Sequence, residues 1–192
     1  MSARAGANEP RLVLASASPQ RRAILGQLGV AFDVVEPGVE ELTEGDPAEL
    51  VVENARRKAR GVAGERVIAA DTAVVLDGRV LGKPVDEDEA RAFLEALAGR
   101  DHHVLSGVAV RDARGERTGL GSARVRFRAL ALADVDRYVA TGEWRGRAGG
   151  YAIQGRGAAL VEEIEGDYWA VVGLPVAEIA CLAPHLLGLE PG

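Results

Sequence analysis

Two arginines stand at the start of a predicted helix, where the free backbone N–H groups already carry a partial positive charge. The segment is LASASPQRR at 14–22, in which Ser18 suits the N-cap and Pro19 the first helical position. At 100° per residue, Arg21 falls in the centre of the apolar stripe of that helix. Such an arginine either extends its charge to solvent, pairs with a buried carboxylate, or holds a phosphate-like anion together with Ser16, Ser18 and backbone N–H groups. The last chemistry would explain why positive charge gathers at this helix end.

Lys58 is placed in a similar way on a second predicted helix, over 47–63. It falls in register with Val51, Ala55 and Val62, on the moderately apolar face of that helix. Its aliphatic stem can cover this face while its ammonium group reaches solvent. The alternative is that the ammonium group faces a site and binds an anion.

Asp71 and Thr72 interrupt an otherwise apolar run, VIAADTAVVL at 67–76, which is typical of a strand buried on both faces. An unpaired carboxylate there is costly, so Asp71 must be paired, protonated, or placed where the strand faces a site. A two-residue turn at 77–78 puts Lys83 opposite Thr72 and therefore close to Asp71. Strict alternation sends the two charged side chains to opposite faces, unless a bulge or the end of regular pairing intervenes. The pair is either a structural salt bridge or a carboxylate–lysine site where a water molecule or a metal meets a phosphate.

The elements that must position these residues alternate between strands and helices, without repeats or low-complexity linkers. Hydrophobic periodicity and turn residues predict helices over 19–29, 47–63, 86–98, 132–141 and 175–188. They predict strands over 11–15, 31–36, 102–112, 117–128 and 158–164, and a hairpin around the turn at 77–78. Hairpins combined with crossover helices indicate an α/β fold with a mixed sheet.

Composition limits the classes of function. The chain has 192 residues and a formal net charge of −6, which argues against a general nucleic-acid partner. No apolar run is long enough to span a membrane, the N-terminus lacks the apolar stretch of a signal peptide, and the single cysteine, Cys181, suggests a reducing compartment. We therefore expect a cytoplasmic protein with one α/β domain over 11–190, preceded by a disordered lead over 1–10.

Several common sites lack support in the sequence. Lys83 follows a glycine but precedes a proline and lacks the upstream glycine spacing of a P-loop, and no G-x-G-x-x-G motif occurs. Three scattered histidines and one cysteine give no zinc pattern. We expect His102 and His103 to be polar surface or structural residues, and Tyr151 to belong to the core rather than to a base pocket.

Six motifs, in this order, resemble those of the Maf family of nucleoside triphosphate pyrophosphatases. They are LASASPxxR at 14–22, GVEE at 38–41, ENARRKA at 53–59, AADTAVVLDGRVLGKP at 69–84, GGYAIQGRGA at 149–158 and EGDYWAVVGLP at 165–175. Six motifs over nearly the whole chain are far more specific than any one alone. The resemblance implies an α/β fold similar to inosine triphosphatase, with an elongated mixed sheet, flanking helices and two lobes around a nucleotide cleft.

The resemblance also implies hydrolysis of a nucleoside triphosphate to the monophosphate and pyrophosphate with a divalent cation, Mg²⁺ or Mn²⁺. The catalytic aspartate of the family falls on Asp71, its acidic partner on Glu41, and its phosphate-binding positions on Ser16, Arg21, Lys58 and Lys83. The implied reaction is in-line attack of water at the α-phosphorus, with the cationic side chains neutralising phosphate charge. Asp71 and Glu41 would hold the metal, and whether Asp71 also orients the water stays open.

Further positions concern which nucleobase the substrate carries. The branch of the family that prefers dTTP and UTP has Asp-Thr after the buried strand and Ile-Gln-Gly in the glycine-rich loop, and this chain matches it at Thr72 and Gln154. A glutamine amide can donate to and accept from a thymine or uracil edge. The chain departs from the pattern at Gln20, because the family usually has arginine directly after Ser-Pro; triphosphate binding and base selectivity are expected to depend on this position.

The resemblance leaves two alternatives beside dTTP and UTP hydrolysis. One is the same chemistry on 7-methyl-GTP or another modified purine triphosphate, whose branch typically has Asp-Gln where this chain has Asp71-Thr72. The other is a non-enzymatic regulator of septum formation, the process after which the family is named. Homodimers are common among similar proteins, and a homodimer is the expected assembly if the chain associates.

Overall fold

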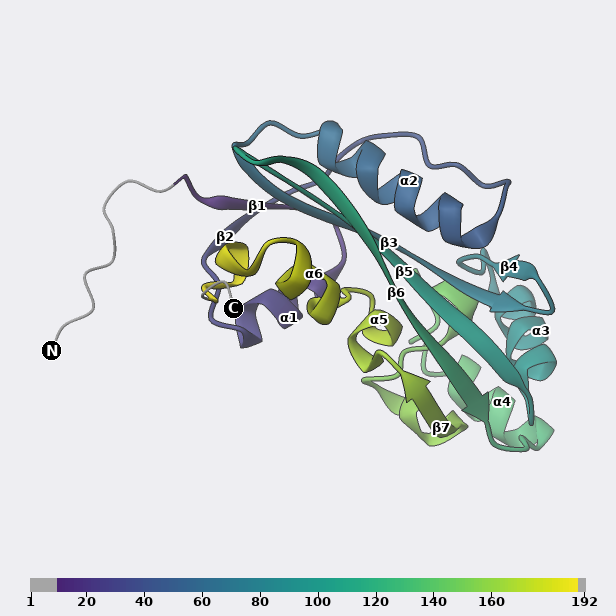
Figure 1. Cartoon of the computed structure of the whole chain (residues 1–192). Helices are drawn as coiled ribbons and strands as arrows, with labels where there is room; N and C mark the ends of the chain where they lie inside the picture. Colours follow the sequence, from purple (N-terminus) through teal and green to yellow (C-terminus); the bar gives the residue numbers. More distant parts are fainter. Residues whose placement is uncertain (1–9, 190–192) are drawn as a thin grey trace, which may run out of the picture.

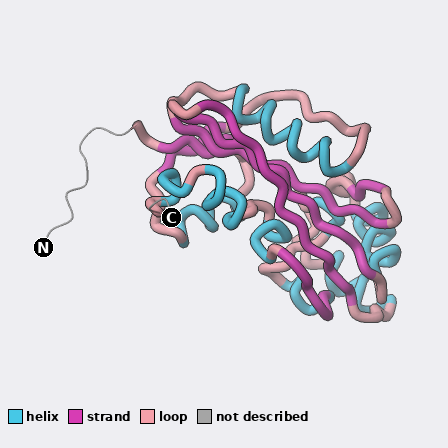
Figure 2. Tube along the Cα trace, viewed as in Figure 1, coloured by secondary structure: helices cyan, strands magenta, loops and turns pink. Residues whose placement is uncertain are grey.

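The computed structural model describes residues 10–189, and its centre is a seven-stranded mixed sheet (Figures 1 and 2). The strand order is β2-β1-β3-β5-β6-β7, and β4 pairs with β3 outside this path. β1 runs parallel to β2 and β3, and the other pairs are antiparallel. The strand bounds are β1 Leu12–Ala15, β2 Phe32–Val35, β3 Arg66–Leu76, β4 Arg79–Leu81, β5 Asp101–Asp112, β6 Gly115–Phe127 and β7 Val161–Gly166.

Helices cover both faces of the sheet. α2 lies on one face of the long strands, and α1, α5 and α6 lie on the other (Figure 1). The helix bounds are α1 Pro19–Gln27, α2 Pro47–Arg60, α3 Glu87–Leu97, α4 Leu132–Val139, α5 Tyr168–Val172 and α6 Val176–Leu182, with 3-10 turns at Ala148–Gly150, Arg156–Leu160 and Pro184–Leu187. The predicted mixed α/β sheet with flanking helices is confirmed. The domain bounds expected from the sequence stay a prediction, and the expected lead over 1–10 falls almost wholly outside the described residues.

Two predicted elements near the C-terminus differ from the structure, and one further helix was missed. The single helix over 175–188 is divided, because Pro184 has no N–H to continue the ladder and Ala183 leaves the helical conformation, with φ −154° and ψ 64°. The strand predicted over 158–164 begins only at Val161, after a 3-10 turn. The helix α5 was not predicted at all.

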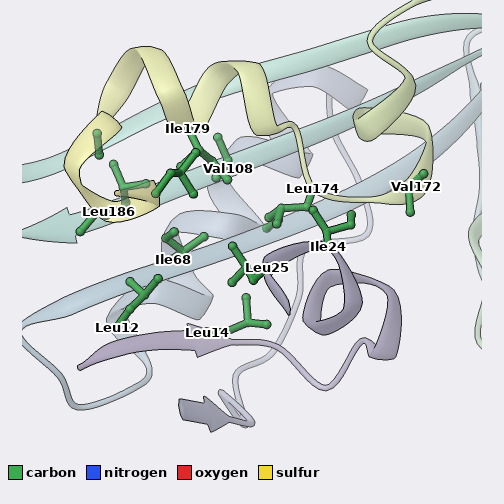
Figure 3. Close-up of a cluster of buried hydrophobic side chains, with 14 residues drawn as sticks. Leu12, Leu14, Ile24, Leu25, Ile68, Val108, Val172, Leu174, Ile179 and Leu186 are labelled. Atoms are coloured by element: carbon green, nitrogen blue, oxygen red, sulfur yellow. The ribbon is translucent and has the colours of Figure 1, made fainter. Parts of the chain in front are cut away.

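Two separate apolar cores lie on the face of the sheet opposite α2. The first packs Ile68 and Ala70 of β3 against α1, α6 and their neighbours (Figure 3). The second packs Val74 and Leu76 of the same strand against α3, α4 and the aromatic residues of the later segments. These four residues share one side of β3, since side chains alternate along a strand. Thr72 occupies the remaining position between them, so it marks the boundary of the two lobes.

The edge of β3 is open at this boundary. β1 pairs with β3 as far as Ala15↔Ala69, and β4 takes over only at Val74↔Leu81. Residues 70–73 therefore face no strand on this side, although β5 continues to pair with them on the other side. The β1–α1 loop and the segment after β4 both leave the sheet at this gap. The fold thus places Asp71 and Thr72 at the only opening of this edge of β3 within the described residues.

Candidate functional site

A cleft of about 790 Å³ opens between the two lobes at the gap in β3. Its walls are the β1–α1 loop with the start of α1, the segment over 36–41, the segment after β4, the stretch over 143–155, and the end of α5. Every residue that the sequence singled out as a site residue lines this cleft: Ser16, Gln20, Arg21, Glu41, Lys58, Asp71, Thr72, Lys83 and Gln154. The fold thus brings together residues that lie up to 138 positions apart in the chain, counted from Ser16 to Gln154.

Asp71 and Lys58 form a buried ion pair on the face of the sheet that α2 covers. Lys58 Nζ lies 2.7 Å from Asp71 Oδ1 and 2.8 Å from Glu41 Oε1. The Lys58 and Asp71 side chains are 8% and 12% exposed, whereas the Glu41 side chain is 42% exposed. One ammonium group therefore bridges a buried carboxylate and a carboxylate that is open to the cleft.

The lysine paired with Asp71 is Lys58. The sequence places Lys83 close to Asp71 without deciding whether the two side chains meet, and in the structure they form no ion pair. Regular pairing of β4 stops at Leu81, two residues before Lys83. Lys83 is exposed, lines the same cleft, and forms no ion pair with any residue of the described part. Its charge is consequently free to interact with a ligand.

Asn54 is a site residue that the sequence analysis missed. Its side chain is buried, and Nδ2 donates to Asp71 Oδ2 at 3.0 Å. The same amide is fixed by the Leu42 backbone: Leu42 N donates to Oδ1 at 2.7 Å, and Nδ2 donates to Leu42 O at 3.0 Å. Asn54 therefore orients Asp71 and anchors the loop that carries Glu41. Its position four residues before Lys58, on the same helix face, was the available signal.

Arg21 is buried and does not extend to solvent. Its Nε donates to Gly173 O at 2.7 Å, Nη1 to Ser16 Oγ at 3.2 Å, and Nη2 to Thr72 Oγ1 at 3.0 Å. Burial lowers the pKa of Arg21, and the charges of Asp71 and Glu41 oppose that effect. All three acceptors are neutral oxygens, so the guanidinium charge at the cleft is not cancelled by a direct carboxylate contact.

The start of α1 is built as the sequence predicts. Ser18 is the N-cap and its Oγ accepts from Arg21 N at 3.5 Å, with Pro19 at the first helical position. Ser16 Oγ accepts from Ser18 N at 3.1 Å, and Gln20 Oε1 accepts from Ser18 Oγ at 3.1 Å. This network shapes the loop at one wall of the cleft, while Gln154 lies exposed on the wall contributed by the later segment.

Comparison with known proteins identifies the family. A family model described as Maf-like protein matches residues 11–185, which is most of the chain. The chain belongs to the Maf family. The resemblance inferred from the six sequence motifs is therefore confirmed.

Curated relatives of this Maf protein share about half of its residues. A dTTP/UTP pyrophosphatase of Anaeromyxobacter dehalogenans is 52% identical over 90% of this chain and 92% of the relative. Proteins of the same name from Pelotomaculum thermopropionicum and Deinococcus radiodurans are 50% and 49% identical, over 88% of this chain and 93% and 89% of the relatives. A solved Ham1 protein of Staphylococcus aureus aligns with a TM-score of 0.44 and 17% identity over 61% of this chain and 71% of that one.

The acidic residues of the Maf cleft suit a cation that arrives with a phosphate ligand. Among residues 10–189, no three histidine, cysteine, aspartate or glutamate side chains gather as a metal site. The Asp71 and Glu41 carboxylates lie close together, on either side of the Lys58 ammonium group that both contact. Mg²⁺ is commonly held by one or two carboxylates with phosphates and waters completing its shell. The two carboxylates fit that mode of binding and do not form an all-protein cage.

Behind the cleft wall, His102 and Tyr151 form a buried polar pair. His102 is 1% exposed, its Nε2 lies 2.8 Å from Tyr151 Oη, and both rings pack edge-to-face with Phe127. Burial lowers the pKa of His102 to about 4 and raises that of Tyr151. His102 and Tyr151 are thus structural residues of the second core, as expected, although Tyr151 also borders the cleft.

Within the described residues, no helix is long and apolar enough to cross a membrane.

We expect His102 to make the protein lose stability in mild acid. The unfolded chain takes up a proton near pH 6.5, whereas the folded chain does so only near pH 4, so stability is fully present above pH 6.5 and is lost as pH falls towards 4. At pH 4.5, His102 alone should lower the free energy of unfolding by about 2 to 3 kcal/mol relative to pH 7. Urea unfolding at pH 7 and 4.5 should show a smaller decline for His102→Gln than for wild type. The matched variant His103→Gln, at an exposed neighbouring position, should keep the wild-type decline; identical declines in all three proteins would contradict the assignment.

Proposed function

We propose that this Maf protein hydrolyses dTTP and UTP to the nucleoside monophosphate and pyrophosphate. The observation that carries the proposal is the Asp71–Lys58–Glu41 cluster at the gap in β3, in a cleft large enough for a nucleotide. The relatives of about 50% identity, which span about nine-tenths of the chain, are all named dTTP/UTP pyrophosphatases and support this choice of substrate.

In the proposed complex, the cationic side chains bind the triphosphate. Arg21 and the Ser16 loop contact it from one wall, Lys58 from the floor, and Lys83 from the other wall. Thr72 and Gln154 recognise the base. The exposed Gln154 amide can donate to and accept from a pyrimidine edge, whereas the Thr72 hydroxyl, which donates to Ser106 and accepts from Arg21, can only accept a further hydrogen bond. Gln20 borders the phosphates in the place where the family usually has an arginine.

The proposed reaction is in-line attack of water on the α-phosphorus. Asp71 accepts a hydrogen bond from the water and takes its proton as the new oxygen–phosphorus bond forms. The bond from the α-phosphorus to the bridging oxygen breaks, and its electron pair leaves with pyrophosphate. Lys58 holds the Asp71 carboxylate in position, and Asn54 fixes its second oxygen. Lys58, Arg21 and Lys83 stabilise the charge that spreads over the phosphate oxygens.

We propose Mg²⁺ or Mn²⁺ as the cofactor, held by Asp71 and Glu41 together with the substrate phosphates. When bound, the cation would supply charge neutralisation at the phosphates and acidify a bound water. We also propose that the protein acts in the cytoplasm, on a small-molecule substrate and without a nucleic-acid or membrane partner. Homodimer formation remains part of this proposal.

The test is a hydrolysis assay with purified protein, a divalent cation, and dTTP, UTP, CTP, GTP and 7-methyl-GTP as separate substrates. Products are separated by ion exchange. The expected result is monophosphate plus pyrophosphate, with dTTP and UTP turned over fastest. Preference for 7-methyl-GTP would overturn the roles of Thr72 and Gln154, and the absence of any hydrolysis by folded protein would favour a non-enzymatic role.

Replacing Gln20 by arginine should tighten substrate binding. The new guanidinium would stand at the cleft wall beside Ser18 and could form a charge-assisted contact with a phosphate. At a partly exposed position this is worth about 1 kcal/mol, so we expect KM for dTTP to fall about fivefold. The control is Gln27→Arg, which adds the same charge to the exposed end of the same helix, outside the cleft. Equal KM values for the two variants would place Gln20 outside the substrate site.

A further inference from the structure

Arg147 lines the cleft on the wall of the second lobe, and the proposed reaction described above does not use it. The residue is half-buried, and within residues 10–189 its guanidinium forms no ion pair and no hydrogen bond. Its Nε is buried without a partner. Burial lowers the pKa of Arg147, and the charge of nearby Glu143 opposes this only in part. A guanidinium in such a place is stabilised when an anion enters the cleft.

The turn that carries Arg147 is fixed against the floor of the cleft. Gly149 N donates to Gly82 O at 3.0 Å, which joins the turn to the residue before Lys83. Gly149 has φ +66°, and a Cβ there would lie 2.8 Å from Val74 Cγ2, so the turn packs directly on β3. Arg147 and Lys83 therefore lie on adjacent backbone segments of one wall.

The charges of the cleft floor show what this wall must supply. Lys58 on the floor and Arg21 on the wall beside it contribute two positive charges, and Asp71 and Glu41 contribute two negative charges. The formal charges of these four residues sum to zero, so further positive charge in the cleft would strengthen the binding of a polyanion. On the wall that carries Arg147, Arg145 already has partners: its Nη2 lies 3.5 Å from Glu87 Oε1, and its guanidinium lies over the Trp144 ring. Lys83 and Arg147 are the cations of that wall without an ion pair to any described residue.

We propose that Arg147, together with Lys83, binds the two outer phosphates of the substrate and holds the pyrophosphate that leaves. The proposal rests on the proposed function, because it places the α-phosphate at Asp71. Gly149 packs on Val74, three residues along β3 from Asp71, which is roughly 10 Å at ~3.3 Å per residue. Val74 and Asp71 point to opposite faces of the sheet, and the cleft at the open edge of β3 reaches both of them. A triphosphate that reacts at Asp71 can extend its outer phosphates towards this wall, where a planar guanidinium can bind phosphate oxygens in a bidentate manner.

The experiment compares Arg147→Met with Arg137→Met, by calorimetric titration with pyrophosphate and with dTMP in the presence of Mg²⁺. Methionine keeps the apolar stem of the arginine, and Arg137 is 77% exposed on α4, outside the cleft. We expect the Kd for pyrophosphate to rise about 10- to 100-fold in Arg147→Met, as for loss of a charge-assisted hydrogen bond. The Kd for dTMP should change less than about twofold, and Arg137→Met should match wild type in both titrations. Arg147→Lys should be intermediate, because it keeps the charge and loses the bidentate geometry.

Three results would overturn the proposal. The first is pyrophosphate binding by Arg147→Met that equals wild type, or no pyrophosphate binding by wild type. The second is weaker binding of dTMP alone, which would assign Arg147 to the base or sugar. The third is an equal loss for both ligands with a lowered Tm, which would indicate a structural role. A wild-type protein that binds pyrophosphate but hydrolyses no nucleotide would refute the proposed function, while the two titrations would still decide the role of Arg147 in anion binding.

Discussion

Replacing Asp71 by asparagine is expected to lower kcat for dTTP about 1000-fold, the typical contribution of a positioned base. Asparagine has almost the same size, but it cannot take a proton from water or hold a cation by charge. The substitution also replaces one acceptor oxygen of Asp71 by an N–H donor. Asp71 accepts from Lys58 on one oxygen and from Asn54 on the other, so an amide in its place sets an N–H donor against one of these donors. Asn54 cannot adapt by rotating, because both ends of its amide are bound to Leu42.

The same donor clash predicts a loss of stability of about 1 to 3 kcal/mol, so turnover must be measured on protein shown to be folded by circular dichroism. Asp77→Asn is the matched control. Asp77 lies in the exposed turn between β3 and β4, pairs with Arg100, and has φ +50°, a conformation that asparagine tolerates well. We expect this control to keep the wild-type kcat. A kcat within about tenfold of wild type for folded Asp71→Asn would mean that another group activates the water.

The sequence revealed the charged residues of the site because each one breaks a local pattern. Arg21 and Lys58 stand on apolar helix faces, and Asp71 stands inside an apolar strand. The structure places each of them at the cleft and buries each one against polar partners. Local periodicity was sufficient for this, since a misplaced charge in a soluble protein needs a partner, and the partner is often at a site.

The sequence could not assign the partners. Counting back from the hairpin turn places Lys83 opposite Thr72 and leaves its contact with Asp71 open. In the structure β4 stops pairing at Leu81, and α2 supplies Lys58 as the partner of Asp71. The open edge of β3 over 70–73 depends on where two other strands end, which is a property of the tertiary fold. The helix α5 was missed for a related reason. It has only five residues, and its apolar run gives no period that separates a short buried helix from a strand.

The close approach of α2 to the sheet depends on Gly107, and Gly107→Ala should damage both stability and activity. Gly107 lies opposite Asp71 in the β3–β5 register. A Cβ at this position would lie 2.4 Å from the carbonyl carbon and oxygen of Val51 and 2.5 Å from Val52 N. These are backbone atoms of α2, so the helix itself must move outward, and it carries Asn54 and Lys58 with it. We expect a loss of about 3 kcal/mol in the free energy of unfolding, the upper part of the usual range for overpacking.

The same movement should lower kcat for dTTP about 10- to 100-fold, because catalytic geometry is sensitive to displacements of the order of 1 Å. Urea unfolding and steady-state kinetics measure the two effects separately. The control is Gly26→Ala on α1, where a Cβ meets nothing within 4 Å; it should keep the wild-type kcat and be as stable or up to about 1 kcal/mol more stable, since alanine favours a helix interior. If Gly107→Ala unfolds earlier but keeps the wild-type kcat, the packing argument holds and the coupling of α2 to Asp71 is wrong. If both quantities stay at wild-type values, α2 can withdraw from the sheet without cost, and the site does not depend on this contact.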